Sequence, residues 1–258
     1  MIALGVMAAL IAGGPIGPDR GAQAPQRFKM DFSMTQSLDL TPMGQGVMDS
    51  EMTGSAYVAL TMSDTTGGQL AHLVVDSIIV NATGVMAMQF PTEAMSAAKG
   101  QFFHAYIVDG KIKGSVNPSL EGSPAMGLAA PVLSVLFVGM PSGKKVGDVW
   151  TDTTRATPPA DGSPGMSNES VTEWTVTAVD GDMVSMTGTQ QGSISGEPQP
   201  GQQLTGTVSG TAEVTSTPGG PARTARLQSE QKMEILIDQA PDVLRMEMKT
   251  TTELTPIP

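Results

Sequence analysis

The residues of this chain that could do chemistry are its two histidines, His72 and His104, together with Asp76. In extended chain, His72 and Asp76 share one face of the segment 70–80, and His104 lies on one face of the segment 101–108. If those two segments are neighbouring strands, two imidazoles and a carboxylate could converge on zinc or copper. Two histidines far apart in sequence are more typical of partly buried structural side chains. We therefore expect neither a metal nor another cofactor.

Methionine thioethers offer a second possible chemistry, because clusters of them can hold copper(I). The pairs Met86/Met88 and Met246/Met248 have the right spacing, and Met30 and Met34 lie in a similar pattern. On a strand, however, residues i and i+2 share a face, so the same spacing arises wherever an apolar face is built from methionine. We favour an apolar face.

Signatures of nucleophilic or acid–base catalysis do not occur in the sequence. Residues 192–196 (GSISG) have isoleucine where a nucleophile elbow requires serine, and residues 64–66 (DTT) lack the glycine of an aspartic protease. The chain contains no cysteine, which excludes disulfides, thiolate catalysis and cysteine-ligated zinc. We expect a protein that is not an enzyme; a hydrolase with a site assembled from scattered residues remains an alternative.

The elements that would position these residues are strands. Residues 28–40 alternate apolar and polar side chains, which indicates one buried and one solvent-facing side. The same pattern predicts strands over 48–62, 70–80, 101–108, 111–116, 171–179, 183–189, 204–216, 222–237 and 243–254. Asp109-Gly110 and Asp180-Gly181 stand between extended runs and predict hairpins. Residues 158–168 and 192–203, rich in proline and glycine, read as loops.

The most apolar stretch, 123–140, contains Pro131 and is too short and broken to cross a membrane comfortably. We expect it to form one or two short helices over the sheet, with another helix over 91–99. The predicted fold is mainly β: a large, curved, half-barrel-like antiparallel sheet, with two or three short helices covering its concave face.

The amino terminus suggests export. Residues 2–12 are apolar, and Ala22-Gln23-Ala24 has the form of a cleavage site, so residues 1–24 are predicted to be a signal peptide. The alternative is an ordinary buried helix. Residues 25–258 are predicted to form one β-rich domain of two related halves, about 27–122 and 145–256, joined by the apolar segment 123–140. Absence of cysteine suits an exported bacterial protein of the periplasm, envelope or medium.

The net charge of −11 limits the classes of partner that the protein can bind. A phosphate backbone would be repelled, so nucleic-acid binding is not expected. Anionic membrane surfaces are disfavoured for the same reason, which leaves peripheral membrane contact or none.

Residues 140–150 (MPSGKKVGDVW) carry a family resemblance. The segment resembles the Pro…Val-Gly-Asp-x-Trp junction of an uncharacterised group of exported bacterial β-rich proteins, many of them lipoproteins. The resemblance implies an apolar helical piece before the junction and a second β-rich half after it. This chain lacks the cysteine that would carry a lipid anchor. In architecture alone, the expected sheet is also similar to the lipoprotein-carrier half-barrel.

The function that these features favour is the binding of an apolar ligand, such as a lipid or part of a lipoprotein, in a cleft between sheet and helices. The motivation is the long apolar strand faces, rich in methionine and poor in aromatic residues, beside the stretch 125–140. The predicted cleft residues are Met30, Phe32, Met34, Leu133, Leu136 and Phe137. The alternative is a structural or protein-interaction module that binds through sheet edges and acidic loops.

Overall fold

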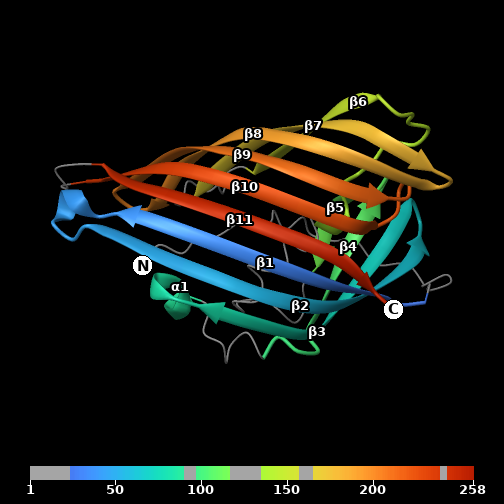
Figure 1. Ribbon diagram of the computed structural model, residues 1–258, viewed down its shortest axis with the longest axis horizontal. Coiled ribbons are helices and arrows are strands. Elements are labelled where there is room, and N and C mark those ends of the chain that lie inside the picture. The colour runs from blue at the N-terminus through green and yellow to red at the C-terminus, as the bar shows by residue number, and fades with distance from the viewer. Residues whose placement is uncertain (1–23, 90–96, 117–134, 157–164, 239–242) are drawn as a thin grey trace.

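The computed structural model describes residues 24–89, 97–116, 135–156, 165–238 and 243–258, and its main feature is one antiparallel sheet of eleven strands. In Figure 1 the sheet curves, so that its two edges come round toward each other. The prediction of a mainly β fold built on one large, curved antiparallel sheet is therefore confirmed.

Each strand follows the alternating pattern of the sequence. In chain order the strands are β1 Gln26–Asp39, β2 Val47–Thr65, β3 Gly68–Ala82, β4 Phe102–Val108, β5 Lys111–Val116, β6 Val149–Ala156, β7 Met166–Asp180, β8 Met183–Gln199, β9 Gln202–Ser216, β10 Ala222–Ile237 and β11 Leu244–Ile257. The predicted Asp109-Gly110 hairpin joins β4 to β5, and both turn residues have positive φ (51° and 71°), as this turn requires.

The two ends of the described chain meet in the middle of the sheet. The strand order is β5-β4-β3-β2-β1-β11-β10-β9-β8-β7-β6, so β1 pairs with β2 on one side and with β11 on the other. Strands β1–β5 therefore lie on one side of the β1–β11 seam and β6–β11 on the other (Figure 1).

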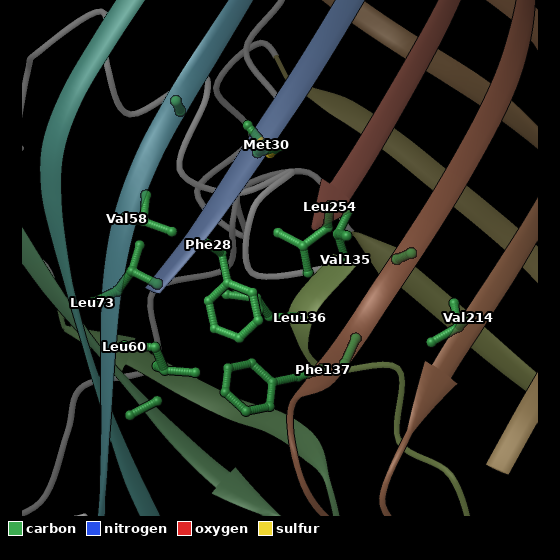
Figure 2. Close-up of a cluster of buried hydrophobic side chains, with 14 of the residues drawn as sticks. Phe28, Met30, Val58, Leu60, Leu73, Val135, Leu136, Phe137, Val214 and Leu254 are labelled. Atoms are coloured by element: carbon green, nitrogen blue, oxygen red, sulfur yellow. The ribbon is translucent and has the colours of Figure 1, made fainter. Parts of the chain in front are cut away.

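The side of the sheet that carries the core is its inner, concave face. Phe28 and Met30 of β1 are each 1% exposed and lie on this face with Val58 of β2 and Leu254 of β11 (Figure 2). Alternate residues of the same strands turn outward and carry the charges, as Lys29 and Asp31 do. Period-two side-chain direction thus separates an apolar face from a charged one.

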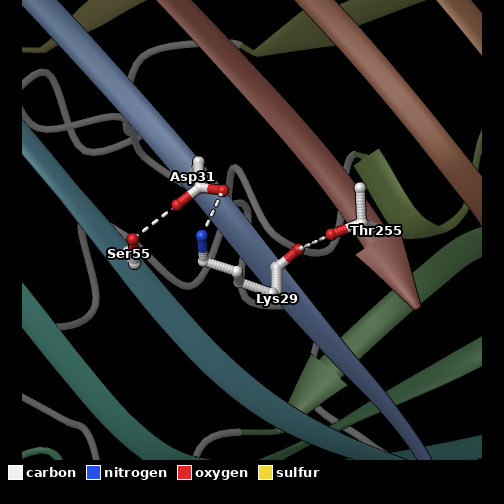
Figure 3. Close-up of polar contacts among 4 residues, drawn as sticks. All are labelled: Lys29, Asp31, Ser55 and Thr255. Carbon is white, nitrogen blue, oxygen red and sulfur yellow. Dashed lines mark hydrogen bonds and ion pairs between the residues drawn. The ribbon is translucent and has the colours of Figure 1, made fainter. Parts of the chain in front are cut away.

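The outer face of the central strands is joined by polar contacts. Asp31 accepts hydrogen bonds from Lys29 within β1 (2.8 Å) and from the Ser55 hydroxyl of β2 (2.5 Å), as Figure 3 shows. The Thr255 hydroxyl of β11 donates to the carbonyl oxygen of Lys29 (3.5 Å). Burial raises the pKa of Asp31, but these two donors and the charge of Lys29 together outweigh burial and leave the pKa below its ordinary value.

The expectation of two or three short covering helices is wrong for the described residues. They contain one complete α-helix, α1 Gly84–Gln89, which contacts β2 and β3, the 3-10 helix η1 Thr41–Met43, and two further helical residues, Val135 and Leu136. Most of the predicted helix 91–99 lies outside the described residues, and residues 97–99 form a turn. Of the predicted helical stretch 123–140, residues 123–134 lie outside the described residues, Val135 and Leu136 are helical, and 137–140 are irregular. Gly139 there adopts φ 70° and lies against the stem of Lys111.

The loop predicted over 192–203 is also wrong. These residues form the end of β8 and the start of β9. Gly192 lies on the inner face opposite Ser170 of β7, and a Cβ atom there would collide with that strand. Gly192 therefore marks a close approach of neighbouring strands, whereas Gly201, at φ 78°, lies in the two-residue turn between β8 and β9.

The edge strands approach each other without pairing in the described sheet. The Lys111 ammonium of β5 forms an ion pair with the Asp152 carboxylate of β6 at 2.6 Å, and both groups are partly exposed. The segment 145–148 lies beside β7, where the Gly147 amide donates to the Val176 carbonyl and the Val176 amide to the Asp148 carbonyl. Gly147-Asp148 thus leads into β6.

We expect Gly54→Val to lower the free energy of unfolding by about 1–3 kcal/mol. A Cβ atom at Gly54 would lie 2.5 Å from the Phe32 ring, which covers this position, and would also press on the backbone oxygen of Ile79. Thr53→Val, on the opposite face, is the control and should change stability little. Urea denaturation measures both; a Gly54→Val variant as stable as the parent would contradict this packing.

Candidate functional site

The candidate site is the inner face, and its larger apolar cluster contains four of the six predicted cleft residues. Met30 and Phe32 of β1 pack in the same cluster as Leu136 and Phe137, which belong to the segment 135–140. Figure 2 shows Met30, Leu136 and Phe137. All four are less than a tenth exposed. The structure therefore brings these two segments together, and these four side chains are packed among protein atoms.

The other two predicted cleft residues are Met34 and Leu133. Met34 is half-buried and packs against both apolar clusters of the inner face, so it lies at the boundary between them. Leu133 lies outside the described residues.

The second apolar cluster lies toward the far end of β1 and its neighbours. Its buried members are Leu40, Leu204, Met233, Ile235, Leu244, Met246 and Met248. The partly buried residues that pack against it are Met34, Leu38, Met166, Ile194 and Ile237. Apart from Leu40, which directly follows β1, all of these residues belong to strands. The first cluster, in contrast, includes Met86 of α1 and the covering segment 135–140.

Between the two clusters the inner face of β7–β11 is polar. We call this region the polar band and define it by Thr172, Gln190, Ser229 and Thr250 in one row across the strands, and by Ser170 and Gln231 in the next row. The Gln190 amide nitrogen donates to the Ser170 hydroxyl at 3.1 Å, and the Ser229 and Thr250 hydroxyls are 2.5 Å apart. Five of the six are half-buried, and Ser170 is buried.

Glycine makes room for the polar band. Gly210 lies in the same row, between Gln190 and Ser229, and a Cβ atom on it would stand 3.4 Å from the Gln190 side-chain oxygen. The Gln190 side chain therefore reaches Ser170 on one neighbouring strand and lies over Gly210 on the other. A larger residue at Gly210 would force it to move.

Charge is confined to the outer face along the strands of the polar band. Where the structure describes β1 and β7–β11, every position facing inward with the core residues is uncharged. On the outer face, Lys249 contacts Glu230 and Glu247, and Arg226 contacts Glu253. These exposed ion pairs contribute little stability. Because the charged residues of these strands occupy outward positions, the inner face of the same strands carries little charge.

Two inward-facing polar atoms near the edge strand β6 have no hydrogen-bond partner. The indole nitrogen of Trp150 is buried and unpaired, although its ring stacks on Trp174 with ring centroids 6.2 Å apart. The side-chain oxygen of Asn168 in β7 is also buried and unpaired. Unsatisfied buried polar atoms are uncommon and are potential ligand contacts.

The two histidines do meet, on the outer face. His72 of β3 stands directly opposite His104 of β4, with ring centroids 4.7 Å apart, and the Phe102 ring lies within 5.5 Å of both. Asp76 is the extra residue of a β-bulge and is exposed. Within the described ranges, no group of three or more potential metal-ligating side chains occurs. The structure therefore pairs the histidines without completing the three-residue site.

The two methionine pairs differ in secondary structure and in burial. Met246 and Met248 are buried side by side on the inner face of β11, as an apolar strand face predicts. Met86 is buried but Met88 is 76% exposed, because this pair lies on α1 and not on a strand. Residues two apart on a helix point to different sides, so Met86 and Met88 do not form a thioether pair.

Two shallow hollows, of about 410 and 470 Å³, lie over the outer face of the sheet. One is lined by residues that include Glu213, Arg226 and Glu253, the other by residues that include Asp49 and Lys249. Neither includes a predicted cleft residue. Among the described helices, none is long and apolar enough to cross a membrane.

The polar band is the feature that sequence reasoning missed. A signal was present: within 204–214 the inward positions include Gly206 and Gly210, and within 225–235 they change from apolar to Ser229 and Gln231 and back again with period two. Because 192–203 was predicted to be a loop, the predicted β8 strand ended too early, and the polar positions on β9 and β10 had no neighbouring strand to be compared with.

Comparison with known proteins gives only distant structural neighbours. No family model and no curated protein matches the sequence. A lipovitellin structure described by its lipid–protein interactions is 11% identical with a TM-score of 0.49; the match covers 91% of this chain and 25% of lipovitellin, so the chain spans about a quarter of that protein.

An outer-membrane channel and a porin give weaker matches. An outer-membrane channel of Pseudomonas putida F1 is 9% identical with a TM-score of 0.20, covering 96% of this chain and all of that one. A variant porin of Rh. blastica is 10% identical with a TM-score of 0.23, covering 91% of this chain and 99% of that one. Likenesses this weak carry no argument about function. The Pro…Val-Gly-Asp-x-Trp family resemblance stays a prediction.

The histidine pair predicts a pH dependence. Burial, and secondarily the nearby His72, lower the pKa of His104 below its ordinary value near 6.5. The unfolded chain then binds the proton more readily, so stability falls as the pH drops from about 6.5 toward the pKa of the folded protein. We expect His104→Gln to weaken this fall, measured by urea denaturation at several pH values.

A second measurement separates the effect of burial on the pKa of His104 from the effect of His72. In the His72→Gln variant, the pKa of His104 measured by NMR titration should move back toward its ordinary value. An unchanged pH dependence in His104→Gln, together with an unshifted pKa in His72→Gln, would contradict the paired arrangement.

Proposed function

We propose that this protein is an exported, non-enzymatic binding protein that holds an apolar ligand, a lipid or the lipid part of a lipoprotein, against the inner face of its curved sheet. The observation that carries the proposal is the second apolar cluster. Its described members come from one layer of strands, together with Leu40 at the end of β1. Its buried members are at most 9% exposed and are already covered by the protein. The five apolar side chains that pack against them are only partly buried, and a ligand chain can cover the apolar surface that these five leave exposed.

The dimensions suit a long ligand. The rows of inward side chains on β1 run from Phe28 in the first cluster to Leu38 in the second, which is about 33 Å at 3.3 Å per residue. The second cluster contains three buried methionines, Met233, Met246 and Met248. Methionine side chains adapt to irregular apolar partners, which favours a surface that accepts acyl chains over one that recognises a single rigid shape.

The binding surface now proposed differs from the cleft that the sequence predicted. Met30, Phe32, Leu136 and Phe137 form packed core at one end. Met34 connects this core to the second cluster, where Ile194 and Ile237 are only partly buried. We therefore place the apolar part of the ligand against the second cluster, with Met34 at its inner end.

A structural or protein-interaction role is the second candidate, and edge strand β6 favours it. Val149 is 51% exposed at the start of this strand, and Thr151 and Thr153 are exposed further along it. An edge of this kind can accept a strand from a partner.

Native mass spectrometry of protein purified from its own host, followed by lipid extraction, tests the proposal. We expect a bound species that dissociates as a lipid. Ile194→Gln should weaken binding about tenfold or more, because it removes an apolar contact worth about 1.5–3 kcal/mol. Ser193→Gln, the adjacent position on the outer face, is the matched control and should keep the parent's occupancy.

Thermal unfolding of the Ile194→Gln and Ser193→Gln variants checks that both are folded, so that a loss of lipid binding cannot be attributed to misfolding. Protein that leaves its host free of lipid, and takes up none when mixed with lipid, would refute ligand binding. Equal loss of lipid in the Ile194→Gln and Ser193→Gln variants would refute the placement against the second cluster.

A further inference from the structure

The polar band suggests what kind of ligand the inner face accepts. It lies between the two apolar clusters, so an apolar chain against the second cluster would bring its polar end to Gln190, Gln231 and Ser229. In a face used only to bury hydrocarbon, these groups would lose hydrogen-bonding water without a replacement, at a cost of about 1–3 kcal/mol each. A polar ligand group among them removes this cost.

The hydrogen-bonding capacity of the polar band is only partly used within the protein. One amide hydrogen bond joins Gln190 to Ser170, and one hydroxyl contact joins Ser229 to Thr250. A glutamine side chain offers two donor hydrogens and an acceptor oxygen with two lone pairs, so Gln190 and Gln231 keep donors and acceptors for a ligand. Gln36, at the β1 end of the second row, donates only to the weak acceptor sulfur of Met246 at 3.0 Å.

The charge of the ligand follows from the charges of the face. On the described strands β1 and β7–β11, no inward position carries a charged side chain that could neutralise a headgroup. The inward-facing Asp152 of β6 is already paired with Lys111. A buried ionic headgroup would keep an uncompensated charge, which is far costlier than burying a hydroxyl or an ester. The net charge of −11 also opposes the approach of an anion.

We propose that the inner face recognises amphiphiles with an uncharged, hydrogen-bonding headgroup, such as monoacylglycerols, with the headgroup at the polar band and the acyl chain against the second cluster. This inference rests on the proposed function and adds the ligand class to it. It assigns Gln190 and Gln231 to headgroup binding.

The test compares two ligands with the same acyl chain, 1-monooleoylglycerol and oleate, by titration of the full chain followed by native mass spectrometry at about pH 8, where oleate is ionised. We expect monooleoylglycerol to bind at least about tenfold more tightly. Gln190→Leu and Gln231→Leu should each weaken monooleoylglycerol binding about fivefold or more, while oleate binding falls less or rises.

Gln191→Leu is the matched control, because Gln191 is the adjacent residue and faces outward on β8. This variant should bind both ligands as the parent does. Oleate binding as tightly as monooleoylglycerol, or Gln190→Leu and Gln231→Leu variants that behave like Gln191→Leu, would overturn the headgroup inference and leave the proposed function standing. Failure of both ligands and of host lipids to bind would refute the proposed function itself.

Discussion

The pairing of β1 with β11 is the constraint on which the rest of this structure depends. It joins residues more than 200 positions apart, from Arg27 opposite Ile257 to Asp39 opposite Arg245, at the centre of the sheet. Without it the chain would form two smaller sheets, each with an apolar face to cover. With it, inward side chains of both halves form one continuous face, and Met30 packs in the same cluster as Leu254. Register matters as much as pairing, because a slip of one residue would turn the charges of β11 toward the core.

The inner face that results is not uniform, and its pattern connects fold to function. At one end, side chains from the sheet, from α1 and from the segment 135–140 form a packed core. At the other, the second cluster is built by the strands and Leu40. The polar band separates them on β7–β11, while β1 and β2 continue the apolar surface with Met34 and Met52. A face that is apolar at both ends, polar between them and uncharged along β1 and β7–β11 is suited to an amphiphile without charge.

The local alternation of apolar and polar residues predicted the strands. It failed where contacts between residues far apart in sequence determine the structure. The alternation in 28–40 needs only the chain's own side chains to be read, and β1 occupies Gln26–Asp39. The direction of the apolar faces followed from the same rule, and Phe28, Met30 and Phe32 are buried as expected. Residues 192–203 were misread because Gly192 and Gly196 reflect the close approach of β7, which lies far away in sequence and cannot be seen in the local pattern. Of the predicted helical stretch 123–140, only 135–140 is described; Val135 and Leu136 are helical there, and the chain becomes irregular toward Gly139, which lies against Lys111. The convergence of His72 with His104 likewise depends on the pairing of β3 with β4.

Cysteine cross-linking tests the central seam most directly, because the natural chain contains no cysteine. Ser33 and Thr251 stand opposite each other on the outer face of β1 and β11, at a separation that a disulfide can span. A protein carrying Ser33→Cys and Thr251→Cys should form an intramolecular disulfide under mild oxidation and keep its stability. A protein carrying Ser33→Cys and Thr252→Cys should not, because Thr252 faces inward. Cross-linking of the second pair in place of the first would show a register shifted by one residue and would contradict the inner face described above.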